Sequence, residues 1–372
     1  MNSLEQKIIE KIKKQGPITF KTFMEMALYE PELGYYASEK TGIGKTGDFY
    51  TSQHVHPVFG TMLGKQLEEM WKIMKKPSDF LIIEPGAGEG YMCKDILDYL
   101  KKCELSNSFI YIIIEKNPFM KVKQKSLLND YEDKVRWIYS LEELSDITGC
   151  ILSNELLDSF PVHMIEMEDE LKEIYVGLNN GSLTEIKGNP SSDDLKYYLK
   201  EFSISLSGGY RTEINLRIKE WLKTVSKVIS EGFIFTIDYG YPVWDYYSED
   251  RNRGTLLCYY KHQVNENPYK NIGGQDITAH INFTSVKKWG EEYDFKTIGF
   301  CQQGIFFVSL GIDEVIQEIY ENHSEYLFEI AKIKKLILPG TIGETHKVMI
   351  QYKGRKNFEL RGFSIKNQKD KL

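Results

Sequence analysis

The stretch Phe80-Leu81-Ile82-Ile83-Glu84-Pro85-Gly86-Ala87-Gly88-Glu89-Gly90 decides the fold, because an apolar run leads into an acid and then into three glycines at alternate positions. A short apolar run bounded by such turn residues predicts a buried strand. Glycine has no side chain and adopts positive φ easily, so the turn can fold tightly and present backbone N–H groups to a ligand at a helix N-terminus. The stretch therefore predicts a strand, a ligand-binding turn and a helix.

The spacing of the glycines separates two classes of nucleoside ligand. In the dinucleotide fingerprint the third glycine comes one place later, where this chain has Tyr91. Glu84 adds a negative charge that a pyrophosphate does not need, but that suits a cationic ligand such as S-adenosylmethionine, with its ammonium and sulfonium groups. We expect Glu84, Gly86, Gly88 and Gly90 to bind this cofactor; the alternative is an ordinary glycine-rich connection between strand and helix.

A second acid follows the next apolar run, Phe109-Ile110-Tyr111-Ile112-Ile113-Ile114, which ends in Glu115. In nucleoside-binding α/β sheets, an acid near this point of the chain binds the ribose hydroxyls. Glu115 is therefore expected to bind the cofactor, so that two acids at strand ends flank one nucleoside. The alternative is a solvated strand terminus.

Composition limits the class of protein and its partners. The chain has 372 residues, 41% of them hydrophobic, and a formal net charge of -7. This charge argues against nucleic acid as a partner, and the longest apolar runs are too short to cross a membrane. The start of the sequence has neither a secretory nor a transit pattern, so we expect a cytoplasmic protein. Its five cysteines are scattered without metal-ligand spacing, and no metal site is expected.

Apolar runs and amphipathic stretches alternate from residue 57 onward, which predicts an α/β fold with a doubly wound parallel sheet. We expect an N-terminal helical region with a covering loop over residues 1–76, followed by the main domain over 77–372. Turn-rich, alternating sequence predicts an insertion of β-hairpin and helical elements at about 161–210. Ligands bind beyond the carboxyl ends of the strands in such sheets, so the polar residues that follow each apolar run matter most.

Several polar segments fall at these positions or in long loops. Asn154 and Glu155 follow the run at Ile151, and Asp238 ends a later run. A stretch around residues 273–284, which includes Asp276 and His280, carries many hydrogen-bonding side chains and is expected to be a loop.

These segments together resemble the MidA family of S-adenosylmethionine-dependent methyltransferases. The resemblance rests on the blocks Gly47-Asp48-Phe49-Tyr50-Thr51-Ser52, Glu84 to Gly90, Asn154-Glu155-Leu156-Leu157-Asp158, Ile237-Asp238-Tyr239-Gly240 and Gln275-Asp276-Ile277-Thr278-Ala279-His280, in this order. It implies a class I (Rossmann-like) methyltransferase with an N-terminal helical cover, in which Asp48 and Thr51 contact the cofactor. It further implies a protein substrate, with an arginine as the methyl acceptor. Glu89 departs from the basic residue that is common at its position in the family.

Methyl transfer to nitrogen needs a positioned nucleophile and a group that removes its proton. An arginine guanidinium is best held by carboxylates. We therefore expect Glu155 to hold or deprotonate the nucleophile and Asn154 to hydrogen-bond to substrate or cofactor, against a purely structural Asn-Glu turn. Asp276 and His280 are candidates for a proton-accepting pair, against hydrogen bonds that stabilise their loop.

Two rival functions stay open at this point. A nucleotide-dependent oxidoreductase would share the fold, but the glycine spacing and Glu84 disfavour it. A non-catalytic assembly factor would keep the cofactor fold and use its surface to bind a partner, because fold alone does not establish activity. The sequence leaves the oligomeric state and the methyl acceptor open.

Overall fold

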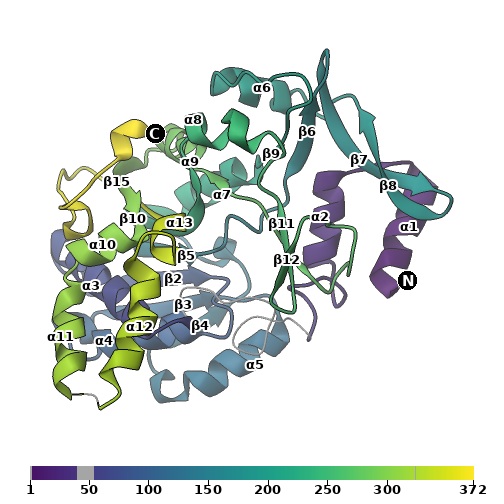
Figure 1. Cartoon of the computed structure of the whole chain (residues 1–372). Coiled ribbons are helices and arrows are strands. Elements are labelled where there is room, and N and C mark those ends of the chain that lie inside the picture. Colours follow the sequence, from purple (N-terminus) through teal and green to yellow (C-terminus); the bar gives the residue numbers. More distant parts are fainter. Residues whose placement is uncertain (1, 40–53, 323) are drawn as a thin grey trace. The chain divides into compact units, whose positions relative to one another are not determined.

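The computed structural model describes residues 2–39, 54–322 and 324–372 (Figure 1). Contacts divide the chain into two compact units, each built from three segments. We call one the accessory unit (Met1–Phe49, Leu157–Glu220 and Tyr241–Val286) and the other the core unit (Tyr50–Leu156, Trp221–Gly240 and Lys287–Leu372). The boundary expected at residue 76 would divide the chain into two consecutive segments. The contacts instead group the N-terminal helices with the strands of the insertion expected at about 161–210.

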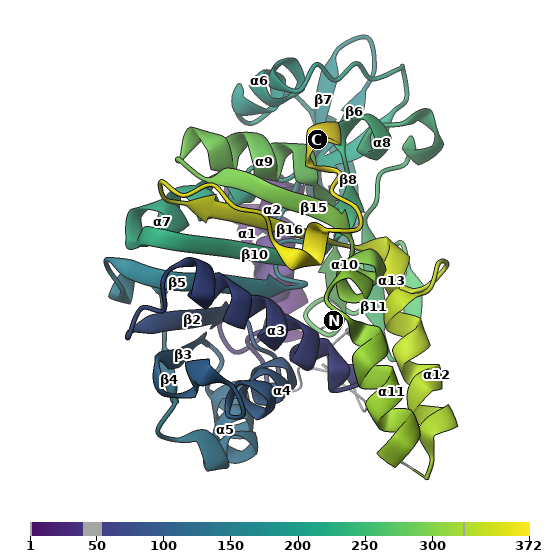
Figure 2. The ribbon, with the colours of Figure 1, turned by 90° about the vertical axis from the view of Figure 1, so that its left-hand side faces the viewer.

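The core unit contains a mixed sheet with strand order β15-β16-β10-β5-β2-β3-β4, and Figure 2 shows these strands stacked from top to bottom. The strands β10, β5, β2, β3 and β4 run parallel to one another, while β16 runs antiparallel to both β10 and β15. Their bounds are β2 Phe80–Pro85, β3 Phe109–Ile114, β4 Val135–Ile138, β5 Ile147–Asn154, β10 Ile229–Tyr241, β15 Lys296–Gln302 and β16 His346–Lys353. The α/β fold predicted from the sequence is confirmed.

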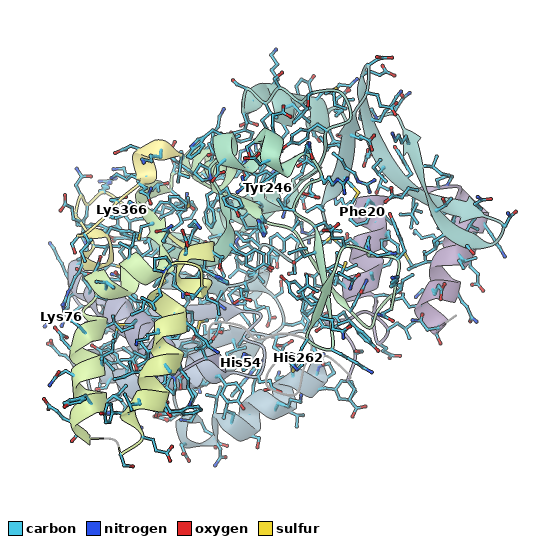
Figure 3. The ribbon with its side chains drawn as sticks, viewed as in Figure 1. Phe20, His54, Lys76, Tyr246, His262 and Lys366 are labelled. Atoms are coloured by element: carbon cyan, nitrogen blue, oxygen red, sulfur yellow. The ribbon has the colours of Figure 1, made fainter. Side chains whose placement is uncertain are left out.

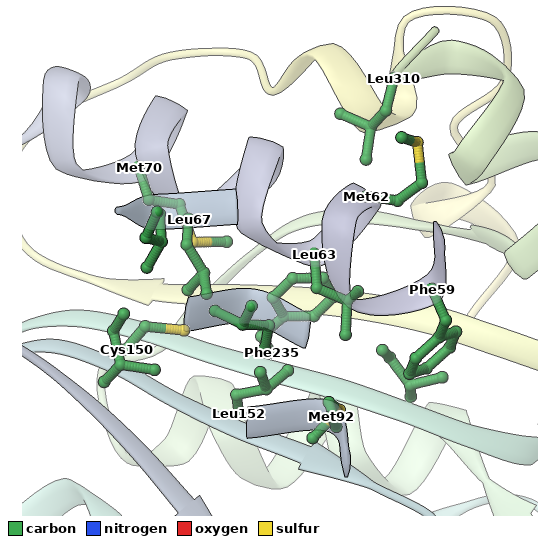
Figure 4. Close-up of a cluster of buried hydrophobic side chains, with 14 of the residues drawn as sticks. Phe59, Met62, Leu63, Leu67, Met70, Met92, Cys150, Leu152, Phe235 and Leu310 are labelled. Carbon is green, nitrogen blue, oxygen red and sulfur yellow. The ribbon is translucent and has the colours of Figure 1, made fainter. Parts of the chain in front are cut away.

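Helices connect and cover these strands. In chain order they are α3 Val58–Ile73, α4 Tyr91–Leu100, α5 Pro118–Leu127, α7 Arg217–Val228, α9 Phe283–Glu292, α10 Gln303–Ser309, α11 Ile312–Asn322, α12 Tyr326–Ile337 and α13 Ile342–Thr345. Helix α3 carries an apolar stripe whose side chains Phe59, Leu63 and Leu67 are fully buried. Figure 4 shows this stripe against the strand side chains Cys150, Leu152 and Phe235. Burial of this face fixes the sheet from which the site residues project.

The accessory unit has its own core and two small sheets. One sheet has the order β1-β7-β6-β9, with β8 paired to β7, and the other has the order β12-β11-β13. Phe20 on α2, labelled in Figure 3, is fully buried in this core. The elements are α1 Ser3–Gln15, β1 Ile18–Thr19, α2 Phe20–Tyr29, β6 His163–Met167, β7 Leu171–Asn179, β8 Ser182–Gly188, α6 Asp194–Glu201, β9 Arg211–Ile214, α8 Val243–Tyr246, β11 Leu257–Tyr260, β12 Gln263–Asn265, β13 Asp276–Thr278 and β14 Ile281–Asn282.

None of the helices within the described ranges is long and apolar enough to cross a membrane.

At Gly149 in β5 the backbone of the neighbouring strand leaves no room for a side chain. A Cβ added there would lie 2.0 Å from the carbonyl oxygen of Leu81, which belongs to the neighbouring strand β2. We expect Gly149→Ala to lower the free energy of unfolding by about 3 kcal/mol, since overpacking forces the backbone to move. Gly208→Ala is the control, because nothing lies within 4 Å of its added Cβ. Urea denaturation measures both, and equal stabilities of the two variants would contradict the prediction.

Candidate active site

The turn after β2 has the backbone that its glycines predict. Gly86, Gly88 and Gly90 have φ values of 69°, 55° and 94°, in the left-handed region that side chains disfavour. Gly90 is also the N-cap of α4, and it has no side chain that could cap this helix end. A ligand could therefore accept hydrogen bonds from the first N–H groups at this positive end of the helix.

Glu84 lies at the end of β2 and is almost completely buried, with 1% of its surface exposed. The Tyr111 hydroxyl, on β3, donates a 2.6 Å hydrogen bond to its Oε2. The pKa of Glu84 is raised to about 7, chiefly by burial; the hydrogen bond from Tyr111 lowers it, and the nearby Glu115 adds a smaller upward shift. Among the described residues, no basic side chain forms an ion pair with Glu84. A buried carboxyl group with a raised pKa is suited to a cationic ligand, because the positive charge would favour its ionised form.

Glu115 follows β3, the strand beside β2. The Asn117 N–H donates to its Oε1 at 2.7 Å, and the Gln124 side chain donates to its Oε2 at 2.9 Å. Burial raises the pKa of Glu115, and the hydrogen bonds from Asn117 and Gln124 oppose this shift. A carboxylate has about four acceptor positions, so Glu115 can still accept bonds from a ligand diol.

The parallel pairing of β2 with β3 brings these two acids to one edge of the sheet, since Pro85 is in register with Ile114. The core unit thus offers an anionic group for a cation, an anionic group for a diol and a glycine turn at a helix N-terminus. These groups fit a nucleoside that carries a positive charge and lacks phosphates.

Asn154 and Glu155 come from the strand on the other side of β2, where β5 ends. Glu155 has φ of 49°, an uncommon left-handed conformation for a residue with a side chain, and its N–H donates to the Ile237 carbonyl at 2.9 Å. The Asn154 amide donates to Glu155 Oε1 at 3.3 Å. The Asn154 Oδ1 is buried, with no hydrogen-bond partner among the described residues. The sheet therefore brings the predicted pair to the same edge as Glu84.

Three polar neighbours of these acids were missed by the sequence analysis: Tyr111, Gln124 and His346. His346 Nε2, on β16, lies 3.4 Å from Glu155 Oε1, and both side chains are about nine-tenths buried. Tyr111 lies in an apolar strand, Gln124 on a helix and His346 on a distant strand. In the sequence, an inward-facing position in such an element cannot be told from an ordinary core position.

Asp276 and His280 belong to the accessory unit, and the stretch expected as a loop contains the short strands β13 and β14 and the start of α9. Asp276 begins β13 and is fully buried, and its Oδ1 accepts hydrogen bonds from the Tyr36 hydroxyl at 2.8 Å and from the Ile277 N–H at 2.9 Å. The His280 N–H donates to Thr255 Oγ1 at 3.0 Å. The loop expectation was wrong because Ile277, Ala279 and Ile281 alternate with the polar residues and are buried. The proton-accepting pair stays a prediction.

The remaining expected cofactor contacts, Asp48 and Thr51, lie outside the described residues.

Comparisons with known proteins agree with this geometry. Residues 62–301 match the profile of Methyltransf_28, a family of S-adenosyl-L-methionine-dependent methyltransferases. The chain belongs to this family. S-adenosylmethionine is accordingly its cofactor, and the resemblance to MidA is confirmed.

Two curated relatives and one solved structure cover most of the chain. The mitochondrial protein arginine methyltransferase NDUFAF7 homolog of Drosophila melanogaster is 24% identical and aligns with 95% of this chain and 85% of its own. The human NDUFAF7 is 23% identical and aligns with 86% of this chain and 75% of its own. A crystal structure from Burkholderia thailandensis with bound S-adenosyl-homocysteine has 26% identity and a TM-score of 0.92, over 100% of this chain and 96% of that one.

Proposed function

We propose that this methyltransferase acts on an arginine side chain of a partner protein. The observation that carries the proposal is the Glu155 carboxylate, held in a left-handed backbone conformation at the end of β5, beside the strand that bears the glycine turn. The curated relatives of this chain are named protein arginine methyltransferases, which supports arginine as the substrate class.

The cofactor, when bound, supplies a methyl group on a positively charged sulfur. Glu84 would face the cationic part of the ligand, Glu115 would accept hydrogen bonds from the ribose, and the turn from Gly86 to Gly90 would allow close approach of the backbone. A dipole at the start of α4 would favour the carboxylate of the same ligand.

Glu155 would perform the work on the substrate. Its carboxylate can pair with a guanidinium and can accept the proton that the attacking nitrogen loses. Asn154 Oδ1, buried and without a hydrogen-bond partner among the described residues, would accept an N–H of the same group. The Glu155 side chain is nearly buried, so the guanidinium would be held in a site of low dielectric where such pairing is strong.

Labelled S-adenosylmethionine, incubated with the protein and a lysate from a strain that lacks it, tests this proposal. We expect label in a protein band and, by mass spectrometry, a methylated arginine. Label on lysine or on a small molecule would contradict the substrate class. No label despite tight cofactor binding would favour the non-catalytic assembly factor.

The compartment is a separate proposal. We propose a cytoplasmic location on the sequence pattern alone, whereas the curated relatives are named as mitochondrial proteins. Cell fractionation with an antibody against the protein tests it.

A further inference from the structure

One fully buried amide joins the parts of the cofactor site. Gln124 lies on α5, and none of its surface is exposed. Its Nε2 donates to the Gly88 carbonyl at 2.7 Å and to Glu115 Oε2 at 2.9 Å. Its Oε1 accepts from the Trp137 indole N–H, on β4, at 3.0 Å. The glycine turn, the strand-end acid and the neighbouring strand therefore meet on a single side chain.

The chemistry of these partners permits only one orientation of the amide. An indole N–H is a donor only, so the oxygen of Gln124 must face Trp137. A backbone carbonyl and a carboxylate are acceptors, so both N–H groups must face Gly88 and Glu115. A leucine or methionine would fill the same space in a core, but it would leave three half-buried polar groups without these bonds.

We propose that Gln124 is a positioning residue for the ribose of the cofactor. By donating to Oε2, it fixes the rotamer of Glu115 and favours its ionised, acceptor-only form, which is the form that can receive two hydroxyl donors. By donating to Gly88, it also holds the turn at a set distance from that carboxylate. The inference rests on the assignment of Glu115 to the ribose in the proposed function, and it adds a residue that confers selectivity for the ribose hydroxyls.

The test measures the affinities of S-adenosylhomocysteine and of its 2′-deoxy analogue by calorimetry. Gln124→Glu keeps the shape but sets a second acid against Glu115 and the Gly88 carbonyl. We expect the affinity for S-adenosylhomocysteine to fall by about 10-fold or more, because the Gly88 carbonyl and the Glu115 carboxylate lose their donor. The affinity for the 2′-deoxy analogue should fall less, so the ratio of the S-adenosylhomocysteine affinity to the analogue affinity should decrease. Gln124→Met should change this ratio in the same direction.

A matched control separates positioning from simple disruption of the core. Gln303 on α10 is also fully buried and donates to the Leu336 carbonyl at 3.2 Å. Gln303→Glu buries a new acid in the same unit and should leave the ratio at its wild-type value. Thermal unfolding without ligand shows whether each variant folds. If Gln124→Glu does not fold, Gln124→Met alone decides the outcome.

Two results would overturn different parts of the account. A wild-type ratio in folded Gln124→Met would make Gln124 a core residue and leave the role of Glu115 intact. A wild-type ratio in Glu115→Gln would remove Glu115 from the ribose, and with it the basis of the inference. A decreased ratio in the Gln124 and Glu115 variants, but not in Gln303→Glu, supports the proposal.

Discussion

Replacement of Glu84 with glutamine is expected to weaken cofactor binding strongly and, at the same time, to stabilise the cofactor-free protein above pH 7. The affinity for S-adenosylmethionine should fall by about 100-fold or more, since breaking a buried ion pair costs about 3–5 kcal/mol. Isothermal titration calorimetry measures this loss. Unchanged affinity would mean that the ligand's positive charge binds elsewhere.

The gain in stability follows from the direction of the pKa shift. Burial raises the pKa of Glu84 from 4.5 to about 7 in the folded protein. Between these values the unfolded chain releases the proton and the folded chain keeps it, so the free energy of unfolding falls as pH rises from about 4.5 to about 7. Glutamine does not titrate. The variant should therefore match the wild type near pH 4.5 and exceed it by an amount on the order of 3 kcal/mol at pH 8.

Asp95 provides the control for this pair of effects. It lies on α4 and is not one of the predicted site residues. Its pKa is raised to about 7, chiefly by burial, while Lys94 lowers it and Asp98 raises it by smaller amounts. Asp95→Asn should show a similar gain in stability with pH, measured by chemical denaturation, and should keep the wild-type cofactor affinity. Loss of affinity in both variants would show that replacing any buried acid with an amide disturbs the site. That result would remove the specific role of Glu84.

The wild-type protein should release a proton when the cofactor binds below pH 7. A cation beside Glu84 favours the carboxylate, so its pKa falls on binding and the proton leaves. Cofactor affinity should consequently increase as pH rises toward about 7 and level off above it. Calorimetry in two buffers with different ionisation enthalpies measures the released proton. A release that persists in Glu84→Gln would assign it to another group.

Replacement of Glu155 with glutamine is expected to reduce methyl transfer by about 100- to 10,000-fold, the range for loss of a general base. Cofactor affinity should stay close to the wild-type value, because Glu155 follows β5 and not the turn after β2. The amide can still accept hydrogen bonds, but it cannot neutralise a guanidinium or take its proton. Single-turnover assays with labelled cofactor, together with calorimetry, separate the two effects.

Glu104→Gln serves as the control for Glu155, because Glu104 is an exposed acid that pairs with Lys76 at the surface of the same unit. It should leave both turnover and cofactor affinity unchanged. Normal turnover in Glu155→Gln would remove this residue from the chemistry. A parallel loss of cofactor affinity would instead place it among the cofactor-binding groups.

The fold could be predicted, as could the edge of the sheet at which the candidate site residues lie, because both depend on local patterns. The apolar run before Glu84 and the run before Glu115 each form a parallel strand, and both acids occur where those strands end. The direction of parallel strands then places their carboxyl ends together, whatever the details of packing. The same reasoning placed Asn154 and Glu155.

The partners of these acids could not be predicted, because they depend on tertiary packing. His346 reaches Glu155 from a strand almost two hundred residues later in the chain, and Tyr111 looks like an ordinary core aromatic. Asp276 seemed to lie in a polar loop, yet its hydroxyl donor, Tyr36, comes from the N-terminal segment of the same unit. Periodicity shows which side chains point inward but not which buried groups they meet.

The measurement that tests the central claim most directly is a crystal structure of the protein with S-adenosylhomocysteine. The account predicts the ligand at the carboxyl ends of β2 and β3, with its ammonium toward the Glu84 side and its ribose hydroxyls within hydrogen-bond distance of Glu115. Ligand density at another place, or a ribose that makes no contact with Glu115, would contradict it.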